Sequence, residues 1–538
     1  MLKGKPRILV LGAGIMQGPA LKIACEMGFE VVAVDADPEA PCVSFADRFR
    51  QIDLKDREGI EAFGRSLLAE GGLSGIMTAG TDFSATVAWA AEKLNLPGIS
   101  YQAALDASDK ERMRKKFKEK GVPSPDFIIL KSPPSANGGF DEKNALPFPF
   151  PVVVKPVDNM GSRGCSKVES FGDLDAAVSS ALKFSRSGRV IVEEFMEGPE
   201  FSVDALVFEG DITICGIADR HIFFPPYFIE MGHTMPSSQS PAVIDSLLET
   251  FAAGIKALGI TCGAAKGDIK LTPQGPMIGE IAARLSGGYM SGWTYPYSSG
   301  VMPAQGAIEI ASGKKPSRTK PEWNWTSAER AFISIPGTVH SITGLEKAQI
   351  MPLVKNVFSR VKCGSIVDFP QNNVTKCGNV ISAAESRLQA VAAAETAARS
   401  VLIRLKAPDE ATESFLFRLG EPFPPDAFAL DSRLLQLLYA LPEGAEGSGV
   451  GSGESLAIMP FPEFAASGIT DYVGRGVNSS LDAVRLLTDM ELPYSSAAAA
   501  GPKNAGELVL GRSFWKAFVR GGYQGAAYFI DKLRETNG

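Results

Sequence analysis

Residues 262–284 read CGAAKGDIKLTPQGPMIGEIAAR. Two runs that alternate apolar and polar residues flank a Pro-Gln-Gly turn, a pattern that predicts a β-hairpin. If the loop is centred on Gln274, Asp268 and Glu280 lie directly opposite one another, with their Cβ atoms about 5 Å apart. Two adjacent carboxylates repel each other unless a cation lies between them. The hairpin therefore predicts a cation site formed by Asp268 and Glu280.

Alternate residues of a strand share a face of the sheet, which gives two facing rows in this hairpin: Glu280, Ala282 and Arg284, and Lys266, Asp268 and Lys270. A divalent metal held by the two carboxylates would also bridge phosphate oxygens, with Arg284 alongside. Oxygen ligands favour Mg²⁺ or Mn²⁺ over zinc. A solvated face with cross-strand ion pairs is the alternative interpretation.

A second candidate for phosphate binding lies in residues 151–165, PVVVKPVDNMGSRGC. Lys155 ends an apolar strand, and the loop that follows contains Gly161, Ser162 and Gly164. Successive small residues let backbone N–H groups approach an anion, and the lysine adds a charge. A triphosphate is a suitable anion, although an ordinary hairpin turn with a solvated lysine would have the same sequence.

The N-terminal sequence predicts a βαβ unit, because the apolar run RILVLG at 7–12 is followed by a helical stretch and a second strand. Its glycines resemble a dinucleotide fingerprint, with Asp35 at the place of a ribose-binding acid. Gln17 replaces the third glycine of that fingerprint. We therefore favour a tight strand-to-helix turn over a nicotinamide site. The first hundred residues predict an open parallel sheet.

The composition excludes several classes of protein. The chain has 538 residues, enough for three or four domains, and its 54 basic and 61 acidic residues give a net charge of -7. No overall basic field attracts nucleic acid or anionic lipid. Seven cysteines at irregular spacing, without a C-x-x-C, favour a reduced cytoplasmic compartment. No stretch approaches the roughly 18 apolar residues of a membrane span. We expect neither nucleic acid nor a membrane as a partner.

Four motifs occur in one order along the chain: Ser108-Asp109-Lys110, Val152–Pro156 with its glycine loop, Val192–Glu200 (VEEFMEGPE), and Gly267-Asp268 with Gly279-Glu280 to Arg284. In this order and spacing the sequence resembles the ATP-grasp superfamily over residues 7–405. Within it, the chain is similar to carboxylate–amine ligases of the bacterial L-amino acid ligase type. It resembles biotin carboxylase and the large subunits of carbamoyl phosphate synthetase more distantly.

The resemblance implies an ATP site. Its residues would be Lys110 and Lys155 at the phosphates, Gly161, Ser162 and Gly164 in the loop that covers them, Glu193, Glu194, Phe195 and Met196 in the adenine hinge, and Glu200 at the ribose. Ser108 is also expected to cap a helix from Asp109 to Lys120, with Lys110 in its first turn.

The resemblance also implies a metal and a substrate site. Asp268 and Glu280 would hold Mg²⁺, or Mn²⁺, and Arg284 would steady the acyl phosphate or a substrate carboxylate. Ser286, Gly287 and Gly288 would border the acceptor site. The family usually has Asn two residues after the metal-binding glutamate. Here that residue is Ala282, so one Mg²⁺ is expected to take water instead or to bind more weakly.

His233 is the candidate for a contact with acyl phosphate or substrate, because it falls between the hinge and the hairpin, where substrate enters in the family. Only three histidines occur in the chain, so catalysis by a histidine triad has few candidates. A packing or surface histidine is the equally weighted alternative.

We expect an α/β and α+β multidomain protein: an N-terminal Rossmann-like pre-ATP-grasp domain (1–105), an ATP-grasp domain of two lobes with ATP between them (106–315), a C-terminal α/β subdomain (316–420) and an extension of unknown role (421–538). The segment 514–533 of that extension is predicted to be helical. Docking of the extension on the body and formation of a homodimer are both open.

The expected function is a Mg-ATP-dependent ligase that activates a carboxylate, an amino acid by the resemblance, as an acyl phosphate and joins it to an amine. Its partners are then small-molecule carboxylates and amines. Three alternatives stay open: carboxy-phosphate chemistry with bicarbonate, a nucleotide-binding regulatory protein with weak turnover, and a nicotinamide oxidoreductase.

Overall fold

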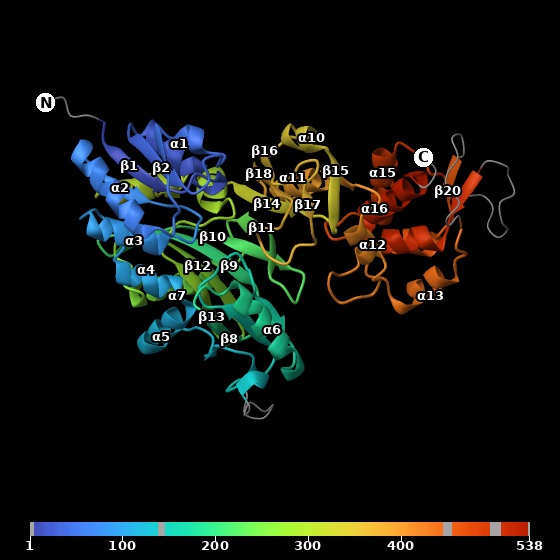
Figure 1. The fold of residues 1–538 in the computed structure, drawn as a ribbon, viewed down its shortest axis with the longest axis horizontal. Helices are drawn as coiled ribbons and strands as arrows, with labels where there is room; N and C mark the ends of the chain where they lie inside the picture. Colours follow the sequence, from blue (N-terminus) through green and yellow to red (C-terminus); the bar gives the residue numbers. More distant parts are fainter. Residues whose placement is uncertain (1–4, 138–145, 445–454, 495–506, 536–538) are drawn as a thin grey trace. The chain divides into compact units, whose positions relative to one another are not determined.

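The structure is a computed structural model that describes residues 5–137, 146–444, 455–494 and 507–535. The chain divides into two compact units (Figure 1): Met1–Glu329 with Ala383–Val391, and Arg330–Ser382 with Ala392–Gly538. These units are larger than the four domains expected from the sequence, whose boundaries at residues 105, 315 and 420 stay predictions.

The first unit begins with a parallel four-stranded sheet, as the sequence predicts. Its strands are β1 (Arg7–Leu11), β2 (Glu30–Asp35), β3 (Arg48–Gln51) and β4 (Gly75–Met77), in the order β3-β2-β1-β4. Its helices are α1 (Gly18–Glu26), α2 (Arg57–Glu70), α3 (Ser84–Lys93) and α4 (Tyr101–Ser108).

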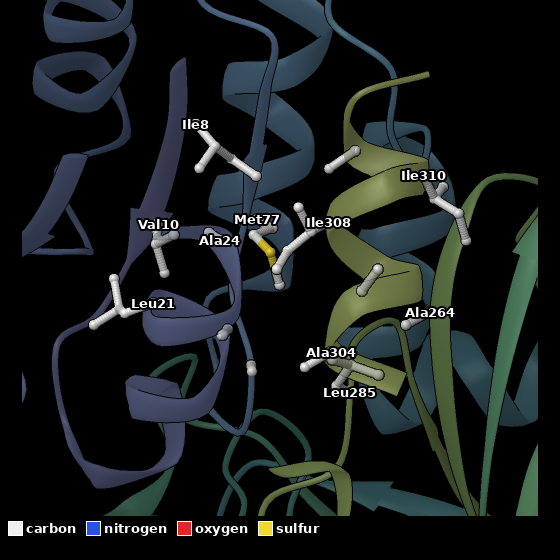
Figure 2. Close-up of a cluster of buried hydrophobic side chains, with 14 of the residues drawn as sticks. Ile8, Val10, Leu21, Ala24, Met77, Ala264, Leu285, Ala304, Ile308 and Ile310 are labelled. Atoms are coloured by element: carbon white, nitrogen blue, oxygen red, sulfur yellow. The ribbon is translucent and has the colours of Figure 1, made fainter. Parts of the chain in front are cut away.

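Strand β1 is buried on both faces, which is typical of a parallel sheet covered by helices. Ile8 and Val10 pack with α1 and with α9 (Pro303–Ala311), as Figure 2 shows for Ile308. Leu9 and Leu11, on the other face, join a separate cluster with residues of α2 and α3. Helix α9 therefore brings the segment after the predicted hairpin onto the N-terminal sheet.

A second sheet contains the strand that ends in Lys155. Its strands are β5 (Phe127–Leu130), β6 (Val152–Pro156), β7 (Ser166–Val168) and β8 (Val190–Glu194), antiparallel in the order β5-β8-β6-β7. Helix α6 (Phe171–Phe184) covers one face, where Leu174 and Val178 pack on Val152 and Val154. Lys155 of β6 and Glu193 of β8 alternate with these apolar residues and so belong to the opposite face.

A third, antiparallel sheet carries the predicted hairpin. Its strands in this unit include β9 (Glu200–Phe208), β10 (Asp211–Phe223), β11 (Ile229–Met235), β12 (Gly263–Thr272) and β13 (Gly275–Ala282), in the order β13-β12-β9-β10-β11. Helices α5 (Lys110–Lys120) and α7 (Pro241–Ala257) bury one face through Phe117 and Phe251. After β13 come a π-helical turn (Met290–Thr294) and α8 (Tyr295–Ser299).

The start of α5 differs from the prediction. Ser108 is the last residue of α4, and the N-cap of α5 is Asp109, whose carboxylate accepts a hydrogen bond from the N–H of Arg112 at 3.1 Å. An ionised carboxylate caps a helix at least as well as a hydroxyl, because it also interacts with the helix dipole. The predicted cap at Ser108 is therefore wrong by one residue, and Lys110 is the first residue of the helix.

The second unit contains a small sheet, β17 (Ile366–Val367), β15 (Gly337–Thr343) and β19 (Leu402–Leu405), and the strand β16 (Val354–Ser359), which pairs with β18 (Gly378–Ala384). Strands β14 (Thr326–Phe332) and β18 and helix α11 (Arg387–Ser400) cross the boundary between the units. The remaining helices of this part are α10 (Leu345–Gln349) and α12 (Glu410–Leu416).

The C-terminal extension is folded around its last helical segment, α16 (Arg512–Glu535), which spans the helix predicted at 514–533 but has a kink at Gly522, where the backbone (φ 59°, ψ -147°) is not helical. The other elements are α13 (Ser432–Ala440), α14 (Pro462–Ala465), α15 (Val477–Thr488) and the parallel pair β20 (Ser455–Ile458) and β21 (Glu507–Leu510). Trp515 is fully buried among them. Asp531 of α16 binds Arg404 of β19 through two bonds of 2.8 and 2.6 Å, so the extension is integrated into the second unit.

Among the described residues, every helix is too short or too polar to span a bilayer.

Candidate active site

The hairpin pairs Asp268 with Glu280, as predicted, although its loop is not centred on Gln274. Thr272 pairs with Gly275, so only Pro273 and Gln274 form the loop. With this loop alone, Asp268 would face Gly279. A β-bulge between Asp268 and Ile269 shifts the register by one residue and brings the two carboxylates opposite each other.

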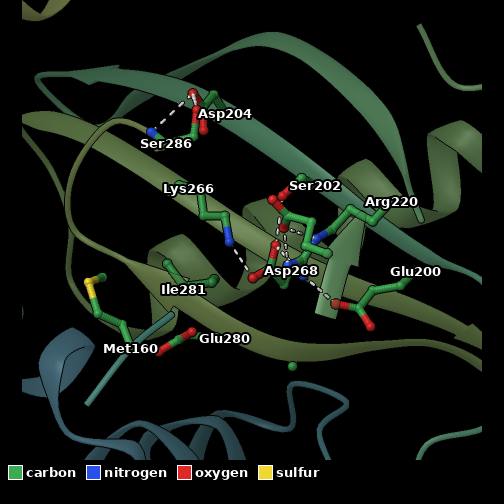
Figure 3. Close-up of polar contacts among 12 residues, drawn as sticks. Met160, Glu200, Ser202, Asp204, Arg220, Lys266, Asp268, Glu280, Ile281 and Ser286 are labelled. Carbon is green, nitrogen blue, oxygen red and sulfur yellow. Dashed lines mark hydrogen bonds and ion pairs between the residues drawn. The ribbon is translucent and has the colours of Figure 1, made fainter. Parts of the chain in front are cut away.

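Asp268 is surrounded by donors (Figure 3). Its Oδ1 accepts a hydrogen bond from Ser202 at 2.7 Å and lies 3.0 Å from Arg220 Nη1, while its Oδ2 contacts the ammonium of Lys266. Burial by itself raises the pKa of Asp268, but the charges of Arg220 and Lys266 outweigh it and lower the pKa. Asp268 is therefore an ionised, buried carboxylate.

Glu280 has a different partner. Its Oε1 lies 3.1 Å from the ammonium of Lys110, the first residue of α5. Burial raises its pKa, but the charges of Lys110, Lys266 and Lys155 lower it to about 2. The glutamate side chain stays 29% exposed. Of the two paired carboxylates, Glu280 is thus the one that remains accessible to a ligand.

The two lysines predicted at the ATP phosphates each contact another residue of the predicted site. Lys110 Nζ donates to the carbonyl of Asn159 in the glycine loop at 2.7 Å, and Lys155 Nζ lies 2.5 Å from Glu193 Oε2. The loop that follows Lys155 uses left-handed backbone at Gly161, Ser162 and Gly164, with φ of 69°, 60° and 69°. The small residues of this sequence therefore allow the left-handed backbone that the loop requires.

Glu193 is a buried ion-pair residue, only 2% exposed. Besides Lys155 it accepts a hydrogen bond from Arg114 Nε at 2.9 Å. Burial raises its pKa, and Arg114 and Lys155 together lower it. The sequence prediction missed Arg114, which lies one helical turn after Lys110 on α5 and could have been found from that spacing.

The remaining hinge residues lie at the end of β8. The N–H of Glu194 donates to the carbonyl of Asp126 at 3.0 Å, and the carbonyl of Met196 accepts a hydrogen bond from Lys270 Nζ at 3.1 Å. The ammonium groups of Lys167 and Lys270 lie over the ring of Phe195, at 4.5 Å and 5.1 Å from its centroid. These contacts fix the segment at which adenine is predicted to bind.

Arg220 on β10 joins the predicted ribose and metal residues. It is 9% exposed in its side chain and contacts Glu200, Glu230 and Asp268. Burial lowers its pKa, but the three carboxylates raise it beyond its usual range. The register of the sheet places Arg220 opposite Glu200. Sequence reasoning missed it, because a single arginine near the end of a long strand carries no motif.

His233 on β11 is 2% exposed and lies between two carboxylates. Its Nε2 is 3.3 Å from Glu230 and its Nδ1 is 3.2 Å from Glu329. Burial lowers the pKa of the imidazole, but the two glutamates raise it to about 9. A Cβ atom on Gly288 would lie 3.3 Å from His233 Cε1, so the histidine borders the predicted acceptor loop. Its role in substrate contact stays a prediction.

The loop predicted to border the acceptor is held by Asp204, a third residue that the sequence prediction missed. Asp204 is fully buried on β9, and its Oδ2 accepts hydrogen bonds from the hydroxyl of Ser286 at 2.6 Å and from its N–H at 3.3 Å (Figure 3). Burial raises the pKa of Asp204 to about 6, although the bonds from Ser286 oppose the shift. Ser202 and Asp204 are two residues apart on β9, so their side chains lie on the same face of the sheet.

Arg284 and the glycines of this loop lie close to other predicted site residues. Arg284 Nη1 donates to the carbonyl of Leu285 at 2.9 Å, and its Nη2 lies 3.7 Å from the sulfur of Met160 in the glycine loop. A Cβ atom on Gly80 would lie 3.2 Å from the Cα of Gly287. This close approach needs glycine at position 80, where φ is 61°, and it joins the loop after β4 to the loop predicted to border the acceptor.

In the glycine-rich N-terminal turn, nearby side chains accept the hydrogen bonds of the backbone amides. Asp35 Oδ2 accepts the N–H of Ala13 at 2.8 Å, and Gln17 Oε1 accepts the N–H of Gly14 at 3.0 Å. Gln17 also donates to the carbonyl of Ala79. These amides are the groups that a dinucleotide pyrophosphate would need. The turn is thus satisfied internally, which favours the structural interpretation over a nicotinamide site.

The described residues contain no group of three or more His, Cys, Asp or Glu side chains in a metal-binding arrangement. The candidate oxygen ligands in the hairpin are the paired carboxylates Asp268 and Glu280. Lys110 contacts Glu280, and Lys266 and Arg220 contact Asp268.

Comparison with known proteins identifies the fold. The structure is similar to that of L-amino acid ligase from Bacillus licheniformis, with a TM-score of 0.64 and 21% identity over 74% of this chain and 99% of that chain. It is also similar to biotin carboxylase from Campylobacter jejuni, with a TM-score of 0.57 and 22% identity over 74% of this chain and 92% of that chain. The first unit thus has the ATP-grasp fold.

The sequence matches are more specific. Residues 148–292 match the ATP-grasp domain, and residues 331–406 match the L-amino acid ligase C-terminal domain 2. The chain therefore carries both of these domains, and the resemblance found in its motifs is confirmed.

Curated relatives are more distant. D-alanine–D-alanine ligase from Mycobacterium avium is 28% identical over 35% of this chain and 54% of its own length. Carnosine synthase 1 from Gallus gallus is 23% identical over 54% of this chain and 34% of its own length. The matched region spans less than two thirds of each of these relatives.

Proposed function

We propose that this protein uses ATP and Mg²⁺ to activate a carboxylate, that of an amino acid, as an acyl phosphate, and then joins it to an amine. The observation that carries the proposal is the pairing of Asp268 with Glu280 beside Lys110. It lies within residues that match an ATP-grasp domain, in a chain that also matches an L-amino acid ligase domain. Curated relatives named as ligases for D-alanine and as carnosine synthase support the same class of reaction.

The proposed reaction has two steps. A carboxylate oxygen attacks the γ-phosphorus of ATP, the bond to the bridging oxygen breaks, and ADP leaves. The amine nitrogen then attacks the acyl carbon, the bond to phosphate breaks, and the nitrogen loses a proton to solvent. Both steps bring anions together, so they depend on positioning and on neutralisation of charge more than on a covalent nucleophile.

The residues present fit a hard divalent cation. Asp268 and Glu280 are ionised and face each other, and a donor set of oxygens alone is what Mg²⁺ or Mn²⁺ prefers. When bound, the metal would neutralise phosphate charge. Glu280 and Asp268 are the proposed ligands.

The roles of the other residues are part of the proposal. Lys110 and Lys155 would donate to phosphate oxygens, the loop with Gly161, Ser162 and Gly164 would cover them, and Arg284 and His233 would meet the acyl phosphate or substrate. Glu193, Glu194, Phe195 and Met196 would border adenine, Glu200 would bind ribose, and Ser286, Gly287 and Gly288 would border the acceptor.

We also propose that the chain has four domains, at 1–105, 106–315, 316–420 and 421–538. The protein would act in the cytoplasm on small-molecule carboxylates and amines. Its proposed assembly is a homodimer, which light scattering would test.

A substrate panel tests the function. Purified protein with Mg-ATP should release phosphate when given an amino acid and an amine, and mass spectrometry should detect the amide product. Phosphate release that needs only bicarbonate would instead support carboxy-phosphate chemistry. ATP binding without turnover across a broad panel would support a regulatory protein. Binding of NADH without binding of ATP would overturn the proposal.

A further inference from the structure

Lys266 occupies an unusual place in the proposed metal site. It lies on β12 directly opposite Ala282 of β13, the position at which the family resemblance leads us to expect a metal-binding Asn. Alanine offers no oxygen ligand. The lysine side chain, 14% exposed, instead reaches along its own strand to Asp268 Oδ2 (Figure 3). A cation of the protein thus lies where a ligand for a second metal would be expected.

The charges around the two carboxylates point the same way. Asp268 has Lys266 on one oxygen and Arg220 and Ser202 on the other, so both of its oxygens are engaged by protein donors. Glu280, by contrast, contacts Lys110 through Oε1 and is partly exposed.

We propose that the ammonium of Lys266 takes the place of one of the two divalent cations implied by the family resemblance, so that nucleotide binds with a single Mg²⁺ held chiefly by Glu280. The inference rests on the proposed ATP-binding function. A lysine carries three donors and one charge, which suits a site that has lost an oxygen ligand and in which Lys266 already contacts Asp268. When a triphosphate binds beside it, Lys266 would donate to a phosphate oxygen and keep its contact with Asp268.

The proposal predicts the number of metal ions bound. Mn²⁺ substitutes for Mg²⁺ and is counted by electron paramagnetic resonance, in the full-length protein saturated with a non-hydrolysable ATP analogue. We expect one Mn²⁺ per chain in the wild type. Lys266→Met removes the ammonium, frees Asp268 Oδ2 and should raise the count to two. Lys256→Met is the control, because Lys256 is an exposed lysine of α7 outside the residues assigned to nucleotide and metal, and its count should stay at one.

Two Mn²⁺ per chain in the wild type would overturn the proposal without any variant, so it stays testable if Lys266→Met fails to fold. An unchanged count of one in folded Lys266→Met and in Lys266→Gln would overturn it as well. If the wild type binds the nucleotide but no Mn²⁺, the metal site of the proposed function fails together with this inference. If it binds two, the proposed function stands and only the role of Lys266 fails.

Discussion

The ammonium of Lys110 and the carboxylate of Glu280 lie 3.1 Å apart, although one begins helix α5 and the other lies on strand β13. This contact joins the helix that carries the first predicted phosphate residue to the hairpin that carries the predicted metal residues. The Lys110 side chain is buried and that of Glu280 is partly exposed, and in such a setting a charged group has a stronger effect on its neighbours than in water. A ligand that enters between them therefore meets charges that are already positioned.

Glu280→Gln should lower turnover by about 100-fold or more, since it removes the accessible charge of the pair while keeping the side-chain shape. Phosphate release under saturating ATP measures the effect, and circular dichroism should show an unchanged fold. Glu249→Gln, on the exposed face of α7, is the control and should keep the wild-type rate. A wild-type rate in Glu280→Gln would contradict the metal assignment.

Arg220→Met should destabilise the first unit by about 3 to 5 kcal/mol, because it leaves the charges of Glu200, Glu230 and Asp268 without their shared partner. The midpoint of thermal or urea unfolding measures the loss. As a control, Arg65→Met breaks an exposed ion pair within α2 and should change stability by about 0.5 kcal/mol or less. Equal losses of stability in both variants would show that the buried network stabilises the protein no more than an exposed ion pair does.

The stability of the first unit should fall as pH rises through about 9, the pKa to which Glu230 and Glu329 raise His233. The imidazolium is favoured in the folded state, so its contribution is complete below the unfolded pKa of about 6.5 and is lost above the folded pKa. The difference amounts to roughly 3 kcal/mol. His233→Gln should flatten the stability curve between pH 6 and 10 relative to the wild type; parallel curves for the two proteins would contradict the assignment.

Asp204→Ala should raise the KM for the substrate that meets the acceptor loop by about 10-fold, the effect of losing one strong hydrogen bond to an ionised group, with little change in the KM for ATP. The variant removes the acceptor of the Ser286 hydroxyl. Ser286→Ala breaks the same contact, so the double variant should be no worse than the more severe single one. Additive effects, or an equal rise in the KM for ATP, would show that Asp204 does not act through Ser286.

Much of the fold could be predicted because its signals are local. The parallel N-terminal sheet follows from uninterrupted apolar runs, and helix α7 and the hairpin follow from periodicity and turn residues. The pairing of Asp268 with Glu280 was predicted correctly from an incorrect loop centre, and the bulge that compensates has no marker in the sequence. The cap of α5 was misplaced by one residue, because Ser108 and Asp109 are both good caps and only the preceding helix α4 decides between them.

The candidate site was predictable where its residues sit in motifs. Arg220, Asp204 and Arg114 were missed, since each acts through partners distant in the chain: Arg220 through Asp268, Asp204 through Ser286, and Arg114 through Glu193. Charge compensation of this kind depends on which strands are neighbours, and strand order is a property of the whole sheet. The pKa shifts of these groups likewise arise from burial that no short stretch of sequence specifies.

The bulge beside Asp268 also determines how this hairpin can be compared and rebuilt. A relative whose loop is one residue longer could pair the same two carboxylates without a bulge. When such a sequence is aligned with this one, a gap at the turn should be matched by an opposite gap inside the strand. The same logic holds for protein engineering. One residue inserted between Pro273 and Gln274 would misplace the acidic pair, and a single deletion at the bulge would restore it.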